Sequence, residues 1–183
     1  AQDTRCWYYR GGWPCYRAGG NTCYASAPTA MNREHCIIGS SRCVAISPSD
    51  SAPALIALDA QFVIQDRGGE RVVDAEDFFM RPSVDIERMT VLRPGELLTT
   101  IRIPSTWAGA TFYYEKVEDR KAWDFALMTV ASAMRINGGV IEEVRMAVNG
   151  AAPFPIRLED SEAVVRGQAP SDELGLRAGE VAV

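Results

Sequence analysis

Alternation of hydrophobic and polar residues is clearest in the second half of the chain, where it predicts several β-strands. Leu97–Ile103 alternates, and Thr111–Val117 is a second run rich in aromatic and β-branched residues. Ala126–Ile136 and Val140–Asn149 flank Asn137-Gly138, which is the strongest short signal for a hairpin turn. We therefore predict a long antiparallel hairpin, although the alanine-rich first arm alone could also form a helix.

Shorter elements are predicted on either side of these strands. Cys43–Ser47 is predicted as a short strand, and Ser49 or Asp50 as the N-cap of the helix that follows. The other predicted elements are a hairpin of Gln61–Gln65 and Arg71–Val73, one or two helical turns in Asp74–Met80, and helices in Arg157–Arg166 and from Ser171 onward.

The combination of short helices with antiparallel strands places the chain in the α+β class. A polar, proline-containing stretch at residues 81–94 separates two β-containing units. We therefore predict one unit at residues 1–80 and a second at residues 81–183.

Residues 1–42 have almost no periodicity. Gly11, Gly12, Gly19 and Gly20 interrupt any regular element, as does Pro14. A loop of this length is uncommon in a compact domain unless it is functional or disordered. Aromatic residues are too frequent here for disorder, so a loop folded around a metal centre is the better explanation.

All five cysteines of the chain lie between residues 6 and 43. Their spacings are C-x8-C, C-x7-C, C-x12-C and C-x6-C, which differ from the C-x2-C pairs of zinc modules and of bacterial ferredoxins. Spacing alone therefore leaves an iron–sulfur cluster, disulfides, a zinc site and unlinked thiols as alternatives.

The odd number of cysteines suggests which of them could act together. Four thiolates complete the ligand shell of a [4Fe–4S] cluster and leave one cysteine over. Cys36 lies in the apolar run H-C-I-I-G, where a small buried thiol is expected. Cys6, Cys15, Cys23 and Cys43 lie beside glycine, arginine or polar residues, a setting that suits thiolate ligands.

Composition and charge exclude several function classes. Of the 183 residues, 47% are hydrophobic and 23% charged, as in globular proteins, and the net charge is −5. The basic residues do not cluster, which argues against nucleic acid or an anionic membrane as the main partner. His35 is the only histidine and no G-x-S-x-G motif is present, so we expect His35 to be structural rather than catalytic.

Five motifs follow one another in a recognisable order. They are R-C-W-Y-Y-R, N-R-E-H-C-I-I-G-S-S-R-C-V-A-I-S-P-S-D, L-R-P-G-E-L-L-T-T-I-R-I-P, Y-E-K-V-E-D-R-K-A-W-D-F-A-L-M-T-V-A-S-A-M-R-I-N-G-G and A-V-N-G-A-A-P-F-P-I-R. In this order, and over nearly the whole chain, the sequence resembles the FAD-binding middle subunit of molybdenum hydroxylases. It is most similar to the branch whose flavin subunit also carries a [4Fe–4S] cluster on an inserted loop, as in periplasmic aldehyde oxidoreductases and 4-hydroxybenzoyl-CoA reductases.

The resemblance implies a fold and a flavin site. Residues 1–80 would be the C-terminal half of a PCMH-type FAD-binding domain, and the rest a CO-dehydrogenase-flavoprotein-like domain with an antiparallel sheet and helices. Asp50 would face the ribityl chain of FAD, Leu98 would meet the flavin ring through its backbone, and Lys116 would stabilise the reduced anionic ring. Trp123 and Asp124 would lie near the flavin edge. The alternatives are that Asp50 only caps a helix and that Lys116 is a solvated strand residue.

The resemblance also implies cofactors and partners. FAD and the [4Fe–4S] cluster would be held by this subunit, with a molybdenum cofactor on a large subunit and [2Fe–2S] centres on a small subunit of a heterotrimer. The glycine-rich pyrophosphate motifs of the family would lie upstream of residue 1, so we expect a partial chain whose partner is the remaining N-terminal half. The substrate would be an aldehyde or an aromatic or N-heterocyclic compound, and the compartment cytoplasmic or periplasmic.

A second class of function stays open at this point. Cysteines held in two disulfides, with one free thiol, would make the chain a disulfide-stabilised secreted binding module. A structural zinc module is a third possibility.

Overall fold

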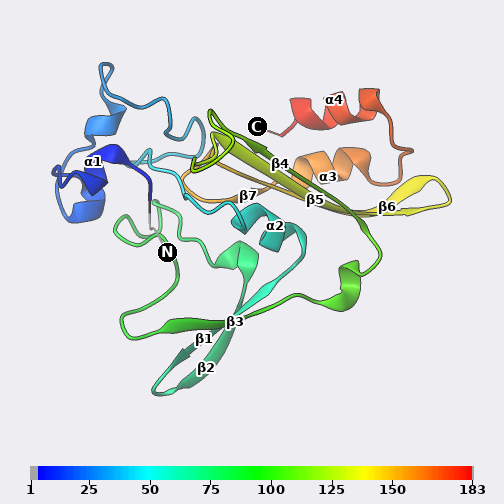
Figure 1. Ribbon diagram of the computed structural model, residues 1–183, viewed down its shortest axis with the longest axis horizontal. Helices are drawn as coiled ribbons and strands as arrows, with labels where there is room; N and C mark the ends of the chain where they lie inside the picture. The colour runs from blue at the N-terminus through cyan, green and yellow to red at the C-terminus, as the bar shows by residue number, and fades with distance from the viewer. Residues whose placement is uncertain (1–3, 183) are drawn as a thin grey trace.

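The computed structural model describes residues 4–182 and contains two antiparallel sheets (Figure 1). The three-stranded sheet has the order β2-β1-β3 and consists of β1 (Gln61–Asp66), β2 (Gly69–Asp74) and β3 (Leu97–Arg102). The four-stranded sheet follows the chain order and consists of β4 (Thr111–Val117), β5 (Met128–Asn137), β6 (Val140–Asn149) and β7 (Ile156–Arg157).

Short helices join and cover these sheets. Helix α2 (Ala52–Ala57) packs against β5 and β6, while α3 (Glu159–Val165) and α4 (Asp172–Glu180) pack on each other and on the face of β6. The amino-terminal lobe, blue in Figure 1, contains α1 (Trp7–Arg10) and the 3-10 turns Tyr16–Ala18 and Tyr24–Ser26. Within residues 4–182, no helix combines the length and apolar character needed to span a bilayer.

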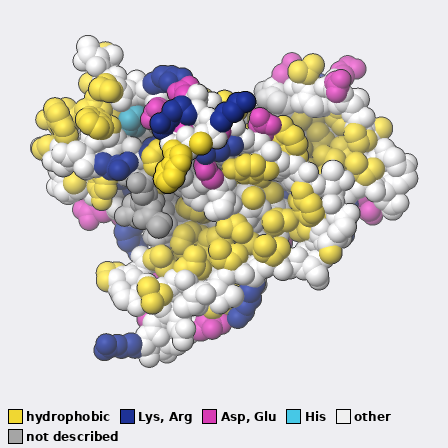
Figure 2. Space-filling view, viewed as in Figure 1, with side chains coloured by type: hydrophobic (Ala, Val, Ile, Leu, Met, Phe, Trp, Pro, Cys, Tyr) yellow, Lys and Arg dark blue, Asp and Glu magenta, His cyan; other side chains and the backbone are white. Residues whose placement is uncertain are grey.

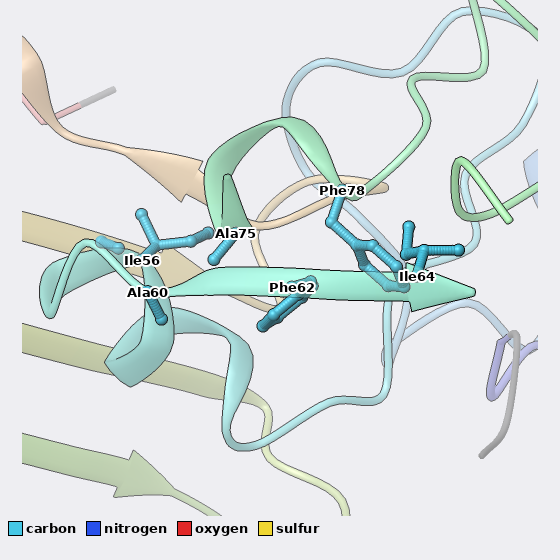
Figure 3. Packing of buried hydrophobic residues seen from close by; sticks show 7 residues of the cluster. Ile56, Ala60, Phe62, Ile64, Ala75 and Phe78 are labelled. Atoms are coloured by element: carbon cyan, nitrogen blue, oxygen red, sulfur yellow. The ribbon is translucent and has the colours of Figure 1, made fainter. Parts of the chain in front are cut away.

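The hydrophobic core under the three-stranded sheet links the two sheets. Phe62 and Ile64 of β1 are buried with residues from α2 and from the turn after β2 (Figure 3). The rings of Phe62 and Phe78 meet edge to face, with their centroids 4.7 Å apart. Ala147 of β6 belongs to the same cluster, so the core continues from one sheet to the other. Burial of one such phenylalanine contributes about 1.5–3 kcal/mol.

The structure confirms the predicted strands from residue 61 onward. The alanine-rich arm is strand β5 rather than a helix, because Thr129, Ala131 and Ala133 alternate into the core and pair with β6. The helix predicted from Ser171 is confirmed, and the Ser171 side chain accepts a hydrogen bond from Leu174 N (3.1 Å). The alanine-rich segment therefore forms a strand because it pairs with neighbouring strands, and this pairing outweighs the local helix propensity of alanine.

Two predictions for this part of the chain differ from the structure. The strand predicted at Cys43–Ser47 was wrong: this run is irregular, and Val44 O accepts a hydrogen bond from Cys36 N of the cysteine loop. The prediction of one or two helical turns in Asp74–Met80 is confirmed by one short turn, the 3-10 turn Ala75–Asp77. Neither Ser49 nor Asp50 caps α2, because Ser51 occupies the N-cap position.

The first sheet extends further along the chain than the predicted unit at residues 1–80. Strand β3 pairs antiparallel with β1, in a register that places Leu98 opposite Ile64. The polar stretch at residues 81–94 is therefore a connection within one sheet, and the chain passes to the second sheet between β3 and β4.

Gly150, directly after β6, is the glycine whose replacement should be most harmful. Its φ is +95°, and a Cβ added there would collide with the carbonyl oxygen of Leu127. We expect Gly150→Ala to lose about 1–3 kcal/mol of unfolding free energy from backbone strain, with the collision adding to this. Urea unfolding measures the loss. Gly139→Ala is the matched control, since Gly139 has φ +83° but open space around its Cβ position; equal losses in both variants would contradict the role of the collision.

Candidate cofactor sites

Four cysteines line one cavity in the amino-terminal lobe. They are Cys6, Cys15, Cys23 and Cys43, the four that residue context selected. Three of them stand immediately before a helical turn: Cys6 before α1, and Cys15 and Cys23 before the two 3-10 turns. The first amide groups of a helical turn have no partner within it, so they are available to a sulfur at this position. The loop therefore gathers sulfur atoms and backbone donors at the same place.

The hydrogen bonds around Cys6 illustrate this arrangement. Burial raises the pKa of the Cys6 thiol, and the backbone N–H groups of Tyr9 and Tyr8 oppose that rise by hydrogen bonding to its sulfur. His35 Nε2 lies 3.2 Å from Cys6 Sγ. Burial, and after it the charge of Arg5, lowers the pKa of His35, so its ring is neutral near pH 7. The surroundings of Cys6 can therefore hold a thiolate once a metal replaces the proton.

The number of thiols around this cavity can be compared with what a metal centre needs. In the described part of the chain, no three Cys, His, Asp or Glu side chains are grouped as ligands of one metal ion. Each thiolate of a cubane cluster binds a different iron, so its cysteines surround a larger core. The four cysteines around one cavity match the number of ligands that such a cluster would require.

Cys36 is separate from the four. It is half-buried and does not line the shared cavity. Burial, and after it the proximity of Cys43, raises the pKa of the Cys36 thiol to about 11. At neutral pH it is therefore a protonated, slowly reacting thiol. All five cysteines are free thiols in the structure, so the disulfide-stabilised binding module is not supported.

A second group of polar residues surrounds Lys116 on β4. Its Nζ donates to Asp50 Oδ2 (2.9 Å) and to Asp124 O (2.7 Å), and it lies 3.0 Å from Glu118 Oε2. Tyr114 OH donates to Asp50 O (3.1 Å). The hydrogen bond to Asp50 is the main cause that raises the pKa of Lys116. Three predicted flavin-site residues, Asp50, Lys116 and Asp124, are thus brought together.

The position of Asp50 depends on the end of β6. Asn149 Nδ2 donates to Ser47 O and to Ser49 O, both at 2.9 Å, and so holds the S-P-S-D segment. The carboxylate of Asp50 then points to Lys116 instead of the helix amides. The interpretation of Asp50 as only an N-cap is therefore wrong, as is that of Lys116 as a solvated strand lysine.

Two predicted flavin-site residues lie outside this group. Leu98 is in β3 of the three-stranded sheet, partly exposed. Trp123 is 96% exposed and has φ +58°, a left-handed conformation that is rare for an aromatic residue. Arg120 stabilises this turn, because its backbone N–H donates to Asp124 Oδ2 (2.9 Å) and its guanidinium to Trp123 O.

Arginines that sequence reasoning missed connect the cysteine loop to the loop that carries Trp123. Arg33 forms a bidentate ion pair with Asp119: Nη1 donates to Oδ2 at 2.6 Å and Nη2 donates to Oδ1 at 2.9 Å. Arg5, next to Cys6, donates to Glu34 O and to Ala126 O. The contacts of Arg33 with Asp119 and of Arg5 with Ala126 span 86 and 121 residues and have no local sequence signal, so only the folded chain reveals them.

Comparisons with known proteins agree with this architecture. Residues 18–106 match the family described as FAD binding domain in molybdopterin dehydrogenase, and residues 112–182 match the CO dehydrogenase flavoprotein C-terminal domain. The chain belongs to the FAD-binding medium subunits of molybdenum hydroxylases. The change from one match to the other falls between β3 and β4, where the chain passes from the first sheet to the second.

Individual relatives support the same assignment. The aldehyde oxidoreductase FAD-binding subunit PaoB of Escherichia coli K12 is 35% identical over 88% of this chain and 50% of its own length. The carbon monoxide dehydrogenase medium chain of Hydrogenophaga pseudoflava is 33% identical over 74% of this chain and 46% of its own length. A solved structure of that dehydrogenase, lacking the Mo-pyranopterin moiety, has a TM-score of 0.65 at 32% identity and covers 73% of this chain and 45% of its own. The chain thus spans about half the length of these relatives.

Proposed function

We propose that this chain is part of an electron-transfer subunit that holds FAD and a [4Fe–4S] cluster within a molybdenum-dependent oxidoreductase. The observation that carries the proposal is the convergence of Cys6, Cys15, Cys23 and Cys43 on one cavity in a chain of the flavin-subunit family. The bound cofactors would supply one- and two-electron chemistry, and the protein would bind them and tune their potentials.

The residues around Lys116 support a role at the flavin. Lys116 offers a cation that would stabilise the reduced, anionic ring, and Asp50 offers an acceptor for a hydroxyl group of the ribityl chain. Asp124 would fix Lys116 through its carbonyl oxygen. The backbone of Leu98 would contribute from β3. In this proposal none of these residues breaks a bond in the organic substrate.

We further propose the partners and substrate class that the family suggests. Electrons would come from a large molybdenum-cofactor subunit through a small [2Fe–2S] subunit, and would leave FAD for an external acceptor. The substrate would be an aldehyde or an aromatic or N-heterocyclic compound, since aldehyde oxidoreductase and nicotine 6-hydroxylase subunits are among the relatives. The complex would work in the cytoplasm or the periplasm.

The exposed apolar residues of β3 and β4 support a further partner, the remaining N-terminal half of the flavin subunit. Leu97, Ile101, Phe112 and Tyr113 are all about half exposed or more. Figure 2 shows hydrophobic side chains over the middle of this face, between the two sheets. Large exposed apolar areas on a protein surface usually mark an interface.

An absorption spectrum of the anaerobically purified subunit, with iron and flavin measured on the same sample, tests the proposal. A broad band near 400 nm with about four irons per chain is expected, because a cubane cluster contains four. A colourless preparation without iron would contradict the cluster, and a preparation without flavin, in the presence of the complete subunit, would contradict the FAD site.

Lys116→Met is expected to weaken FAD binding about tenfold in the complete subunit, equivalent to about 1.4 kcal/mol. It removes the cation and leaves Asp50 without its partner. The measurements are the flavin content after dialysis and the midpoint potential of the flavin. The midpoint potential is expected to become more negative. Lys121→Met is the matched control, since Lys121 is exposed in the following loop; similar flavin loss in both variants would refute the assignment of Lys116.

A further inference from the structure

Arg17 is the buried cation of the cysteine cavity. It lies in the 3-10 turn that follows Cys15, is 5% exposed, and lines the cavity with the four cysteines. Its Nε donates to Cys43 Sγ at 3.0 Å. Its Nη1 donates to the carbonyl oxygens of Ile86 and Arg88, at 3.0 and 3.2 Å. One guanidinium thus joins a sulfur atom of the site to the segment before β3.

The remaining nitrogen of Arg17 has no partner among the described residues. Nη2 is buried and makes no hydrogen bond, although leaving a buried donor unsatisfied costs about 1–3 kcal/mol, and more for a charged group. None of the ion pairs in the described part of the chain involves Arg17. A guanidinium keeps its positive charge in proteins, so both the charge and the free N–H call for an anionic acceptor.

We propose that Arg17 donates to the iron–sulfur cluster itself, from Nε to the Cys43 thiolate and from Nη2 to a sulfur of the cluster core, and that it raises the reduction potential of the cluster. This assignment rests on the proposed [4Fe–4S] site. A cubane with four thiolates is anionic, and its sulfur atoms are the hydrogen-bond acceptors that this cavity would contain. The carbonyl oxygens of Ile86 and Arg88 hold the guanidinium of Arg17 in place against the cavity.

The direction of the effect follows from electrostatics. Reduction adds one negative charge to the cluster, and a cation held beside it in a low-dielectric site stabilises the reduced form more than the oxidised form. Hydrogen bonds to cluster sulfurs act in the same direction. Removing Arg17 should therefore make the cluster harder to reduce.

The test is an EPR-monitored redox titration of the cluster in the full anaerobic complex, with iron counted per chain. Arg17→Gln should keep its iron and shift the midpoint to a more negative potential. We expect the ratio of reduced to oxidised cluster at fixed potential to fall at least tenfold, which is about 59 mV for a one-electron couple. Arg17→Lys, which keeps the charge but loses the fork of donors, should fall in between.

Arg42→Gln is the matched control. Arg42 lies beside Cys43 and lines the same cavity, but it is exposed and stacks on the Tyr16 ring at 5.5 Å from its centroid. Solvent screens such a charge, so its removal should shift the midpoint much less. Equal midpoints in the Arg17→Gln and Arg42→Gln proteins would overturn the proposal while leaving the cluster itself in place.

The outcomes separate this inference from the proposed function. A wild-type complex without iron would refute the cluster and the role of Arg17 together. If Arg17→Gln loses its iron, Arg17→Lys decides: a retained cluster with a more negative midpoint supports the proposal, and a retained cluster with the wild-type midpoint overturns it.

Discussion

Serine at any one of Cys6, Cys15, Cys23 or Cys43 is expected to reduce the iron content of the subunit from about four per chain to near zero. Each of these cysteines contributes to the wall of one cavity, and a cubane cluster needs one thiolate for each iron. A serine hydroxyl is far harder to deprotonate than a thiol, so it is a poor replacement for a thiolate ligand.

Cys36→Ser is the matched control for this series. Cys36 lies in the same loop but does not line the cavity, and the raised pKa of its thiol keeps it protonated. The variant should therefore keep its iron and its absorption band. Iron loss from Cys36→Ser, or an unchanged iron content in Cys6→Ser, would show that the four-cysteine assignment is wrong.

Thiol counting separates the remaining possibilities for the same loop. After denaturation with acid and a chelator, a cluster-bearing chain should present five reactive thiols, in agreement with the five free cysteines of the structure. A chain with two disulfides would present only one reactive thiol. The count therefore tests the sulfur chemistry independently of colour and iron.

Most strands could be predicted from sequence because their information is local, whereas the pairing of β3 with β1 could not be. Period-two alternation identified β3 and β6, residue composition identified β4, and Asn137-Gly138 located the hairpin turn. The alanine-rich arm was ambiguous, since alanine favours helices, and pairing with β4 and β6 on both sides decides it. The run Cys43–Ser47 has strand-like residues, but neighbouring loop groups take its hydrogen bonds. A segment with a strand-like pattern therefore forms a strand only where a partner strand is available to pair with it.

The flavin-site group could not be derived from local pattern. Asp50 and Lys116 are 66 residues apart, and only the resemblance to a family placed both near one cofactor. The sequence could not show the contacts that hold these residues in place. Asn149 holds the Asp50 segment, and Arg5 and Arg33 join the cysteine loop to the loop that carries Trp123. Such contacts between irregular segments carry no periodicity, so they appear only after folding.

The buried ion pair of Arg157 and Glu162 should dominate the stability of the second sheet and its helices. Glu162 of α3 is 1% exposed. Its two carboxylate oxygens accept from Arg157 Nε and Nη2, at 2.9 and 2.7 Å, and Oε1 also accepts from Met146 N of β6 at 2.9 Å. The hydrogen bond to Glu162 is the main cause that raises the pKa of Arg157. One carboxylate thus joins α3 to the strand that ends at Asn149.

Glu162→Ala is expected to lower the free energy of unfolding by about 3–5 kcal/mol, because it leaves a partly buried guanidinium and a backbone N–H without their acceptor. Urea unfolding of the wild-type and variant chains measures the loss. Glu159→Ala is the matched control: Glu159 is in the same helix and 3.8 Å from Arg157 Nη1, but its side chain is 74% exposed. Its replacement should cost about 0–1 kcal/mol. Equal losses in the two variants would mean that burial of the Glu162 carboxylate does not decide the stability of this unit.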